Sequence, residues 1–135
     1  MSKMRLQIIS PKRILFDGEC SMLEYNTSEG QVGVLPGHVA MTQILAPGKL
    51  TIYEDNKENP TYIAVMSGIS KIMPDTVVLL TEVAELAGEI DLERAESAKD
   101  RAEKRLTEKN PNIDMDRAAA ALKRALARLE VAKIR

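Results

Sequence analysis

A short pattern, Ile-Asp-x-x-Arg-Ala, occurs twice near the end of this 135-residue chain, at 90–95 and again at 113–118. In each copy the aspartate stands where the N-cap of a helix is expected, because its carboxylate can accept from the free N–H groups of the first turn. A second acidic residue follows two positions later and suits the positive end of the helix dipole. The pattern therefore predicts that each copy begins a helix.

The segment Asn110-Pro111-Asn112 separates the two predicted helices. The residue before a proline is disfavoured in the α region, and the proline has no N–H with which to continue the helix. The chain should therefore turn back on itself here. We expect an antiparallel hairpin of two helices, at 92–108 and 115–134.

The chain before this hairpin has a different pattern. From residue 4 to residue 83, short β-branched and aliphatic runs alternate with turn residues about every ten positions, which is typical of an all-β sandwich or barrel. Turns rich in Gly, Pro and Asn, including the one at 55–60, separate the runs. The predicted strands are 4–10, 14–26, 31–35, 41–44, 49–54, 61–66, 69–73 and 76–83. The expected fold class is α+β, an N-terminal antiparallel β-sandwich or barrel followed by the helical hairpin.

The apolar period changes from two to about 3.6 between residues 84 and 89, which predicts two domains, 1–88 and 89–135. The predicted hairpin faces are lined mainly by alanine, with Leu126 widening the stripe of the second helix. A methyl-sized contact contributes at most about 0.8 kcal/mol, whereas ordering a residue costs roughly 1.5 kcal/mol. The hairpin should therefore be marginal alone and need the sandwich, a partner or a ligand.

Charge is distributed unevenly along the chain. Residues 117–135 carry six basic residues and one acidic residue, a net charge of +5, whereas residues 1–88 carry seven basic and ten acidic residues, a net charge of −3. A basic helix of this kind suits an acidic protein surface or a nucleotide. It has none of the aromatic residues or glycines expected beside the bases of a nucleic-acid module, so we expect no nucleic-acid partner.

Cys20 and His38 are the single cysteine and the single histidine. A hydrolase built on both would lack a third, orienting group, so we expect no catalytic site and interpret Cys20 as a buried apolar residue. His38 is expected at an exposed interface and not as a metal ligand. The sequence shows neither a signal peptide nor an apolar run long enough to span a membrane, which predicts a cytoplasmic protein without membrane insertion.

Residues 29–38 read Glu-Gly-Gln-Val-Gly-Val-Leu-Pro-Gly-His and resemble a segment of the epsilon subunit of F-type ATP synthases. Further similarity at 46–50, 64–68, 77–80 and 84–106 follows in one unbroken order. Three residues depart from the family pattern. Gln31 stands where that family commonly has an acid, and Met66 where it commonly has Gly or Ser. Gly88 is an unusual, helix-breaking residue in the segment that joins the sandwich to the hairpin. From the residues alone, the segments 30–33 and 36–38 can also be two turns around a short strand.

The resemblance implies a non-catalytic subunit of the central stalk, bound to the gamma subunit and to the membrane rotor ring of c subunits. Such a subunit couples proton flow to ATP synthesis, and its mobile hairpin restrains ATP hydrolysis by acting on the catalytic beta subunits. The resemblance further implies a peripheral position on the cytoplasmic face of the cell membrane. It makes Gln31 and His38 the expected rotor-ring contacts.

In some bacterial members of that family, Ile/Leu-Asp-x-x-Arg-Ala on the first helix marks an ATP site formed by the folded hairpin. The matching positions here are Glu85, Ile90, Asp91, Arg94, Ala95, Arg101, Arg124 and Arg128. ATP, with or without magnesium, is thus implied as a regulatory ligand, with arginine forks on its phosphates and Glu85 and Asp91 at the base or ribose.

Two alternatives stay open at this point. Asp91 and Arg94 can be a helix cap with an intrahelical ion pair, as the echo at Asp114 and Arg117 suggests. The chain can also be a stand-alone nucleotide-sensing module, which would be monomeric and would not co-purify with a large ATPase.

Overall fold

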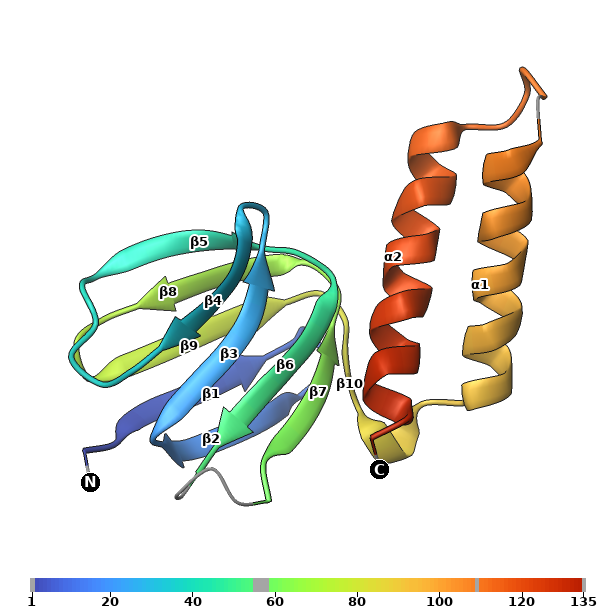
Figure 1. Cartoon of the computed structure of the whole chain (residues 1–135). Coiled ribbons are helices and arrows are strands. Elements are labelled where there is room, and N and C mark those ends of the chain that lie inside the picture. The colour runs from blue at the N-terminus through green and yellow to red at the C-terminus, as the bar shows by residue number, and fades with distance from the viewer. Residues whose placement is uncertain (1, 55–58, 109, 135) are drawn as a thin grey trace.

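The computed structural model describes residues 2–54, 59–108 and 110–134, and it shows a β-sandwich beside a two-helix hairpin (Figure 1). The expected fold class is confirmed. The strands are β1 (Met4–Ile9), β2 (Ile14–Cys20), β3 (Met22–Thr27), β4 (Gly30–Val34), β5 (Met41–Leu45), β6 (Gly48–Tyr53), β7 (Thr61–Val65), β8 (Gly68–Ile72), β9 (Thr76–Thr81) and β10 (Ala84–Leu86). A 3₁₀ turn, η1 (Ala87–Glu89), leads to the helices α1 (Leu92–Thr107) and α2 (Met115–Ala132).

Two strand predictions need correction. The run predicted as one strand at 14–26 is two strands, β2 and β3, which break at Ser21. Ser21 donates from its N–H and its Oγ to the carbonyl of Tyr53, at 2.7 and 2.9 Å, while β2 pairs with β1 and β3 pairs with β6. A period-two pattern continues through such a change of partner, which is why the sequence did not reveal it. Strand β10, which pairs with β7, was not predicted either, and most of the predicted turn at 55–60 lies outside the described residues.

The strands form one continuous sheet that folds over into two layers (Figure 1). Their order is β10-β7-β6-β3-β5-β8-β9-β1-β2, with β4 paired to β3. The pairings recorded for the described residues are antiparallel except β1 with β9, which runs parallel from Arg5 opposite Thr76 to Ile9 opposite Leu80. Most of the sandwich separates these two strands in sequence, so no tight turn constrains their relative direction.

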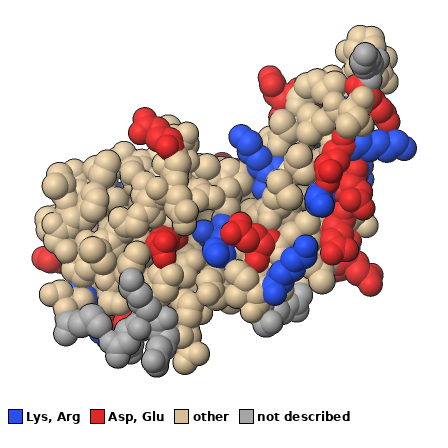
Figure 2. All heavy atoms as spheres, viewed as in Figure 1, with Lys and Arg blue, Asp and Glu red and all other residues tan. Residues whose placement is uncertain are grey.

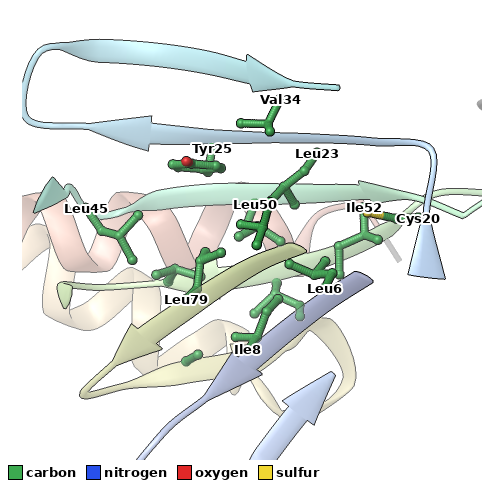
Figure 3. Packing of buried hydrophobic residues seen from close by; sticks show 14 of the residues in the cluster. Leu6, Ile8, Cys20, Leu23, Tyr25, Val34, Leu45, Leu50, Ile52 and Leu79 are labelled. Carbon is green, nitrogen blue, oxygen red and sulfur yellow. The ribbon is translucent and has the colours of Figure 1, made fainter. Parts of the chain in front are cut away.

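Aliphatic side chains fill the space between the layers (Figure 3). Leu6, Ile8, Leu23 and Leu50 are completely buried. Tyr25 reaches into the same core, and its hydroxyl forms hydrogen bonds with Ser70 at 2.6 Å and with Gln43 at 2.9 Å. The core of the sandwich therefore consists of residues from the strands alone.

Cys20 is completely buried, as expected for an apolar cysteine. Burial raises the pKa of its thiol to about 11, so the thiol is protonated near neutral pH. A protonated and inaccessible sulfur cannot act as a nucleophile, which removes the hydrolase interpretation.

Both helices begin where the repeated pattern predicts, and they end within two residues of the predicted positions. Asp91 accepts from the backbone N–H of Arg94 at 3.1 Å, and Asp114 accepts from that of Arg117 at 3.0 Å. The predicted N-caps are confirmed. In both copies the aspartate bonds to the backbone of the arginine.

Helix α2 lies between α1 and the sandwich (Figure 1). Its residues Ala127, Val131 and Ala132 belong to a buried cluster with Ala64 of β7 and Met66. The prediction that Leu126 widens the apolar stripe is wrong, because Leu126 is 44% exposed. The sheet covers the other side of the helix, where it buries the small side chains of residues 127 and 131. The hairpin is therefore docked on the sandwich.

No helix among the described residues is long and apolar enough to cross a membrane.

Candidate functional site

A pocket of about 410 Å³ opens where the sandwich meets the hairpin. We call it the junction pocket. Its lining residues come from β10, η1, the start of α1 and the second half of α2, and they are Glu85, Glu89, Ile90, Asp91, Arg94, Ala95, Ala98, Arg101 and Arg128. Seven of the eight residues predicted for an ATP site are among them. The volume lies within the range of about 300–1,000 Å³ that is usual for small-molecule sites.

The local sequence explains how α1 presents its part of the pocket. Ile90 and Ala95 are buried in the cluster that joins hairpin and sandwich, which anchors the beginning of the helix. Residues spaced by three, four and seven positions share one face of a helix. Arg94, Ala98 and Arg101 therefore line the same wall, and the small side chain at 98 leaves room between the two arginines.

The acidic end of the pocket is held by two ion pairs. Glu85 Oε1 accepts from Arg128 Nε at 2.5 Å. Glu89 accepts from both terminal nitrogens of Arg13, Nη1 at 2.6 Å and Nη2 at 2.5 Å. The hydrogen bonds from Arg13 lower the pKa of the Glu89 carboxyl, so Glu89 is ionised at neutral pH, and the two ion pairs fix both side chains in place.

The basic end of the pocket is open. The side chains of Arg94 and Arg101 are exposed, and within the described part of the chain neither guanidinium group forms a salt bridge. Arginine presents paired N–H donors that match two oxygens of a phosphate group. The pocket can therefore take a ligand with phosphates at Arg94 and Arg101 and a polar edge near Glu85 and Asp91.

Arg124 is the exception among the predicted residues. It lies one helical turn from Arg128 toward the tip of the hairpin, about 6 Å along the axis. There it lines two other cavities, one with Lys123 and Pro47 and one with Arg105 and Arg117. Arg124 therefore does not line the junction pocket in this structure, and its assignment to an ATP site stays a prediction.

Two charged residues of this site were not anticipated from the sequence. Glu89 lines the pocket, and Arg13 holds Glu89 from the connection between β1 and β2. Glu89 directly precedes Ile90 of the repeated pattern, so its position in the sequence could have indicated that it belongs to the site. Arg13 lies 76 residues away from Glu89, so only the tertiary structure brings it to the site.

The predicted rotor-ring residues lie on or after β4. Gln31 is exposed near the start of that strand, and His38 is half-buried in the connection to β5, with its Nδ1 2.8 Å from the carbonyl oxygen of Val39. The same connection exposes Leu35 and Val39, the latter by 78%. It therefore offers an apolar surface, and the rotor-ring roles of Gln31 and His38 stay predictions.

A second exposed apolar feature crosses five strands. Successive register partners are Ile44 with Ile69, Ile69 with Leu80, Leu80 with Ile9, and Ile9 with Ile14. We call these five residues the apolar row. Four of them are exposed by 42–64%, and a shallow cavity lies beside Ile9, Ile69 and Leu80. Contiguous exposed apolar surface of this kind marks a protein interaction site.

Charged side chains crowd the hairpin, whereas the face of the sandwich seen in Figure 2 is largely uncharged. Acidic side chains follow the outer edge of the hairpin in this view. On this face the sandwich therefore offers a largely uncharged surface and the hairpin an ionic one.

Comparison with known proteins identifies relatives over the whole chain. Residues 3–87 match the family described as ATP synthase, Delta/Epsilon chain, beta-sandwich domain, and residues 89–133 match its long alpha-helix domain. The ATP synthase epsilon chain of Bacillus licheniformis is 38% identical over 134 residues, which is 98% of this chain and 100% of that one. The corresponding chain of Brevibacillus brevis is 41% identical over 134 residues, with the same coverage.

Solved structures show the same fold in more distant proteins. A chain of the mitochondrial ATP synthase of Euglena gracilis matches with a TM-score of 0.84 at 22% identity, over 98% of this chain and 82% of that one. A chain from the central stalk and c-ring of the Tetrahymena thermophila mitochondrial ATP synthase matches with a TM-score of 0.59 at 15% identity, over 98% and 96%. At these identities the likeness concerns the fold.

Proposed function

The chain belongs to the ATP synthase delta/epsilon chain family, as an epsilon subunit of the central stalk, and from this premise we propose that the junction pocket binds ATP and holds the hairpin in its folded position. One observation carries the proposal. Residues from the sandwich, the linker and both helices converge on one pocket whose basic end has two arginines outside any salt bridge of the described residues. The subunit itself is a regulator and not a catalyst.

Binding in this pocket favours the folded hairpin for a geometric reason. Glu85 belongs to the sheet, Arg94 to α1 and Arg128 to α2. If the hairpin extended away from the sandwich, these three residues would separate and the site would no longer exist. A ligand that binds only the folded state stabilises it by mass action, by about 2.7 kcal/mol at a hundredfold excess over its dissociation constant.

The charges of the pocket suggest how ATP is oriented. Glu85 and Asp91 offer acceptors for the base or the ribose, and Arg94 and Arg101 offer donors for the phosphates. Arg128 already pairs with Glu85. Magnesium, when it accompanies ATP, would bind through the phosphates.

The docked hairpin is held modestly enough to be mobile. Besides the small buried side chains, the described ion pairs between α2 and the sandwich are Arg128 with Glu85 and Lys49 with Glu130, the latter at 3.7 Å. Partly exposed pairs of this kind contribute about 0–1 kcal/mol each. When ATP falls, the hairpin is released, and its basic second helix restrains ATP hydrolysis by contacting acidic surfaces of the catalytic beta subunits.

The sandwich is the part that joins the stalk. We assign the apolar row to the gamma subunit and the surface around Gln31, Leu35 and His38 to the c subunits of the rotor ring. Both assignments rest on exposed apolar side chains of the sandwich. The chain then lies peripherally on the cytoplasmic face of the cell membrane.

The ATP proposal is tested by calorimetric titration and thermal shift of the isolated protein with ATP. The double variant Asp91→Ala with Arg94→Ala should lose binding. The matched control is Asp100→Ala with Lys104→Ala, which removes one acidic and one basic residue from the same helix at positions that line neither the junction pocket nor the cavity at the tip of the hairpin. Absence of heat from the wild type at millimolar ATP, or equal binding by the two variants, would refute the proposed site.

The inhibitory role has its own test. Replacing Lys123 and Arg124 with Ala should raise ATP hydrolysis by the assembled enzyme, because both cations are exposed on α2. Arg128 is left unchanged since it also holds the folded state through Glu85. Unchanged hydrolysis with normal assembly would contradict inhibition by the basic helix. A pull-down from cell membranes separates a stalk subunit from a stand-alone nucleotide sensor.

A further inference from the structure

The resemblance between the two helices extends well beyond the six-residue pattern. Residue i of α1 corresponds to residue i + 23 of α2, so that Arg94, Arg101 and Arg105 correspond to Arg117, Arg124 and Arg128. The buried alanines correspond as well, Ala95 with Ala118 and Ala102 with Ala125. The two N-caps have nearly the same backbone angles, φ −81° and ψ 106° at Asp91 and φ −77° and ψ 103° at Asp114. The hairpin is an internal duplication in sequence and in structure.

Antiparallel packing of two equivalent helices creates two equivalent sites, one at each end of the hairpin. At the junction pocket, Arg94 and Arg101 of α1 meet Arg128 of α2. At the opposite end of the hairpin, Arg117 and Arg124 of α2 meet Arg105 of α1 around a cavity of about 280 Å³. We call this second cavity the tip pocket. It accounts for Arg124, which the junction pocket leaves out.

The correspondence covers the whole lining of the tip pocket. Each of its eight lining residues has a counterpart 23 positions away among the residues that line the junction pocket. Asp114 corresponds to Asp91, Arg117 to Arg94, and Arg105 to Arg128. Glu85, which belongs to the sandwich, is the one lining residue of the junction pocket without a counterpart.

The charges of the two pockets differ in a way that predicts different ligands. Three arginines of the junction pocket face three acids, Glu85, Glu89 and Asp91. The tip pocket has three arginines and a single acid, Asp114, whose carboxylate caps α2. Within the described residues, none of the three tip arginines takes part in a salt bridge. The tip pocket therefore carries the larger positive charge, and it has no sandwich wall to enclose a base.

We propose that the tip pocket is a second anion site that binds a pyrophosphate-sized phosphate group between α1 and α2. The inference rests on the proposed function, because the junction pocket is the template for the phosphate chemistry. Arginine forks from both helices match phosphate oxygens. An anion held there joins the two helices to each other without touching the sandwich, so it stabilises the closed hairpin and adds to the effect of ATP at the junction.

The test uses pyrophosphate as the probe in the full-length chain with the junction pocket disabled. The background variant, Arg94→Gln with Arg101→Gln, removes the open arginines of the junction pocket. Adding Arg105→Gln and Arg117→Gln disables the tip pocket as well. The matched control adds Lys99→Gln and Lys104→Gln instead. Both lysines lie on α1 and line neither pocket, and their substitution removes the same charge. Glutamine is a good helix former, and circular dichroism checks that each variant is folded.

Calorimetric titration should show one pyrophosphate site in the background variant and in the lysine control. The tip variant should bind at least about tenfold more weakly, because two of three charge-assisted contacts are lost. No binding by the background variant, or equal binding by the tip variant and the lysine control, would overturn the inference. ATP titration of the wild type tests the junction pocket separately. Failure of the wild type to bind ATP would count against the junction site, whereas failure of the background variant to bind pyrophosphate would count against the tip pocket.

Discussion

Arg128 in the last helix and Glu85 in the last strand meet at 2.5 Å, 43 residues apart in the chain. Both side chains are about 30% exposed, and both line the junction pocket. The same two residues therefore hold α2 against the sandwich and form one wall of the candidate site. Ligand binding and hairpin docking are coupled through this pair.

A double-mutant cycle with Glu85→Gln and Arg128→Gln measures that coupling. We expect an interaction energy of about 0.5–1 kcal/mol for the docked hairpin, since the pair is partly exposed to solvent. Hydrogen exchange of the α2 amides reports the docking equilibrium. Additive effects of the two substitutions would show that the pair contributes nothing to docking.

The same substitution at two neighbouring residues of α2 should affect docking of the hairpin very differently. Ala127→Glu places a carboxylate against the sheet, where Ala127 is 3% exposed, and should release the hairpin at a cost of about 3 kcal/mol or more. Leu126→Glu, at a position that is 44% exposed, should change little. Limited proteolysis should then cut the hairpin of the first variant and leave the sandwich intact. Equal proteolysis of the two variants would contradict the docked arrangement.

The pair of Arg13 and Glu89 predicts a pH dependence at the linker. Arg13 lowers the pKa of Glu89 below its ordinary value of 4.5, so the folded state binds this proton less readily than the unfolded state. The contribution of the pair is therefore fully present above pH 4.5 and is lost as the pH falls through the lowered pKa. Titration followed by NMR should show a higher midpoint for Glu89 in Arg13→Gln than in the wild type. The same midpoint in both proteins would rule out the pair in solution.

The apolar row predicts a site of assembly. Ile69→Glu should weaken co-purification with the gamma subunit at least about tenfold, because it places a charge within the row, between Ile44 and Leu80. Ile69 is 42% exposed, so the sandwich should keep its thermal stability. Leu126→Glu on the hairpin is the control for an added charge at an exposed aliphatic position. Normal assembly of the Ile69 variant would place the partner elsewhere.

Cys20 should be inert in the folded protein. With a thiol pKa of about 11, about one thiol in a thousand is ionised at pH 8, and the side chain is fully buried. A thiol reagent should label the native protein far more slowly than the protein in denaturant. Rapid labelling of the native protein would show that β2 opens readily.

Short-range signals in the sequence were sufficient for the hairpin. The caps at Asp91 and Asp114 and the break at Pro111 act within one or two helical turns, so the residues themselves specify where each helix begins and ends. The same spacing placed Arg94 and Arg101 on one face, and burial of Cys20 was expected because a free cysteine behaves as a small apolar side chain. These features depend on neighbours in sequence.

Contacts between distant segments could not be read in the same way. The break at Ser21, the parallel pairing of β1 with β9, and the reach of Arg13 to Glu89 each join segments that are far apart in the chain. The exposure of Leu126 and the separation of Arg124 from Arg128 depended on which side of α2 the sheet covers. A helical pattern specifies a face but not its neighbour, because apolar burial has no preferred direction. Packing of α2 between the sheet and α1 settled which arginines share a pocket.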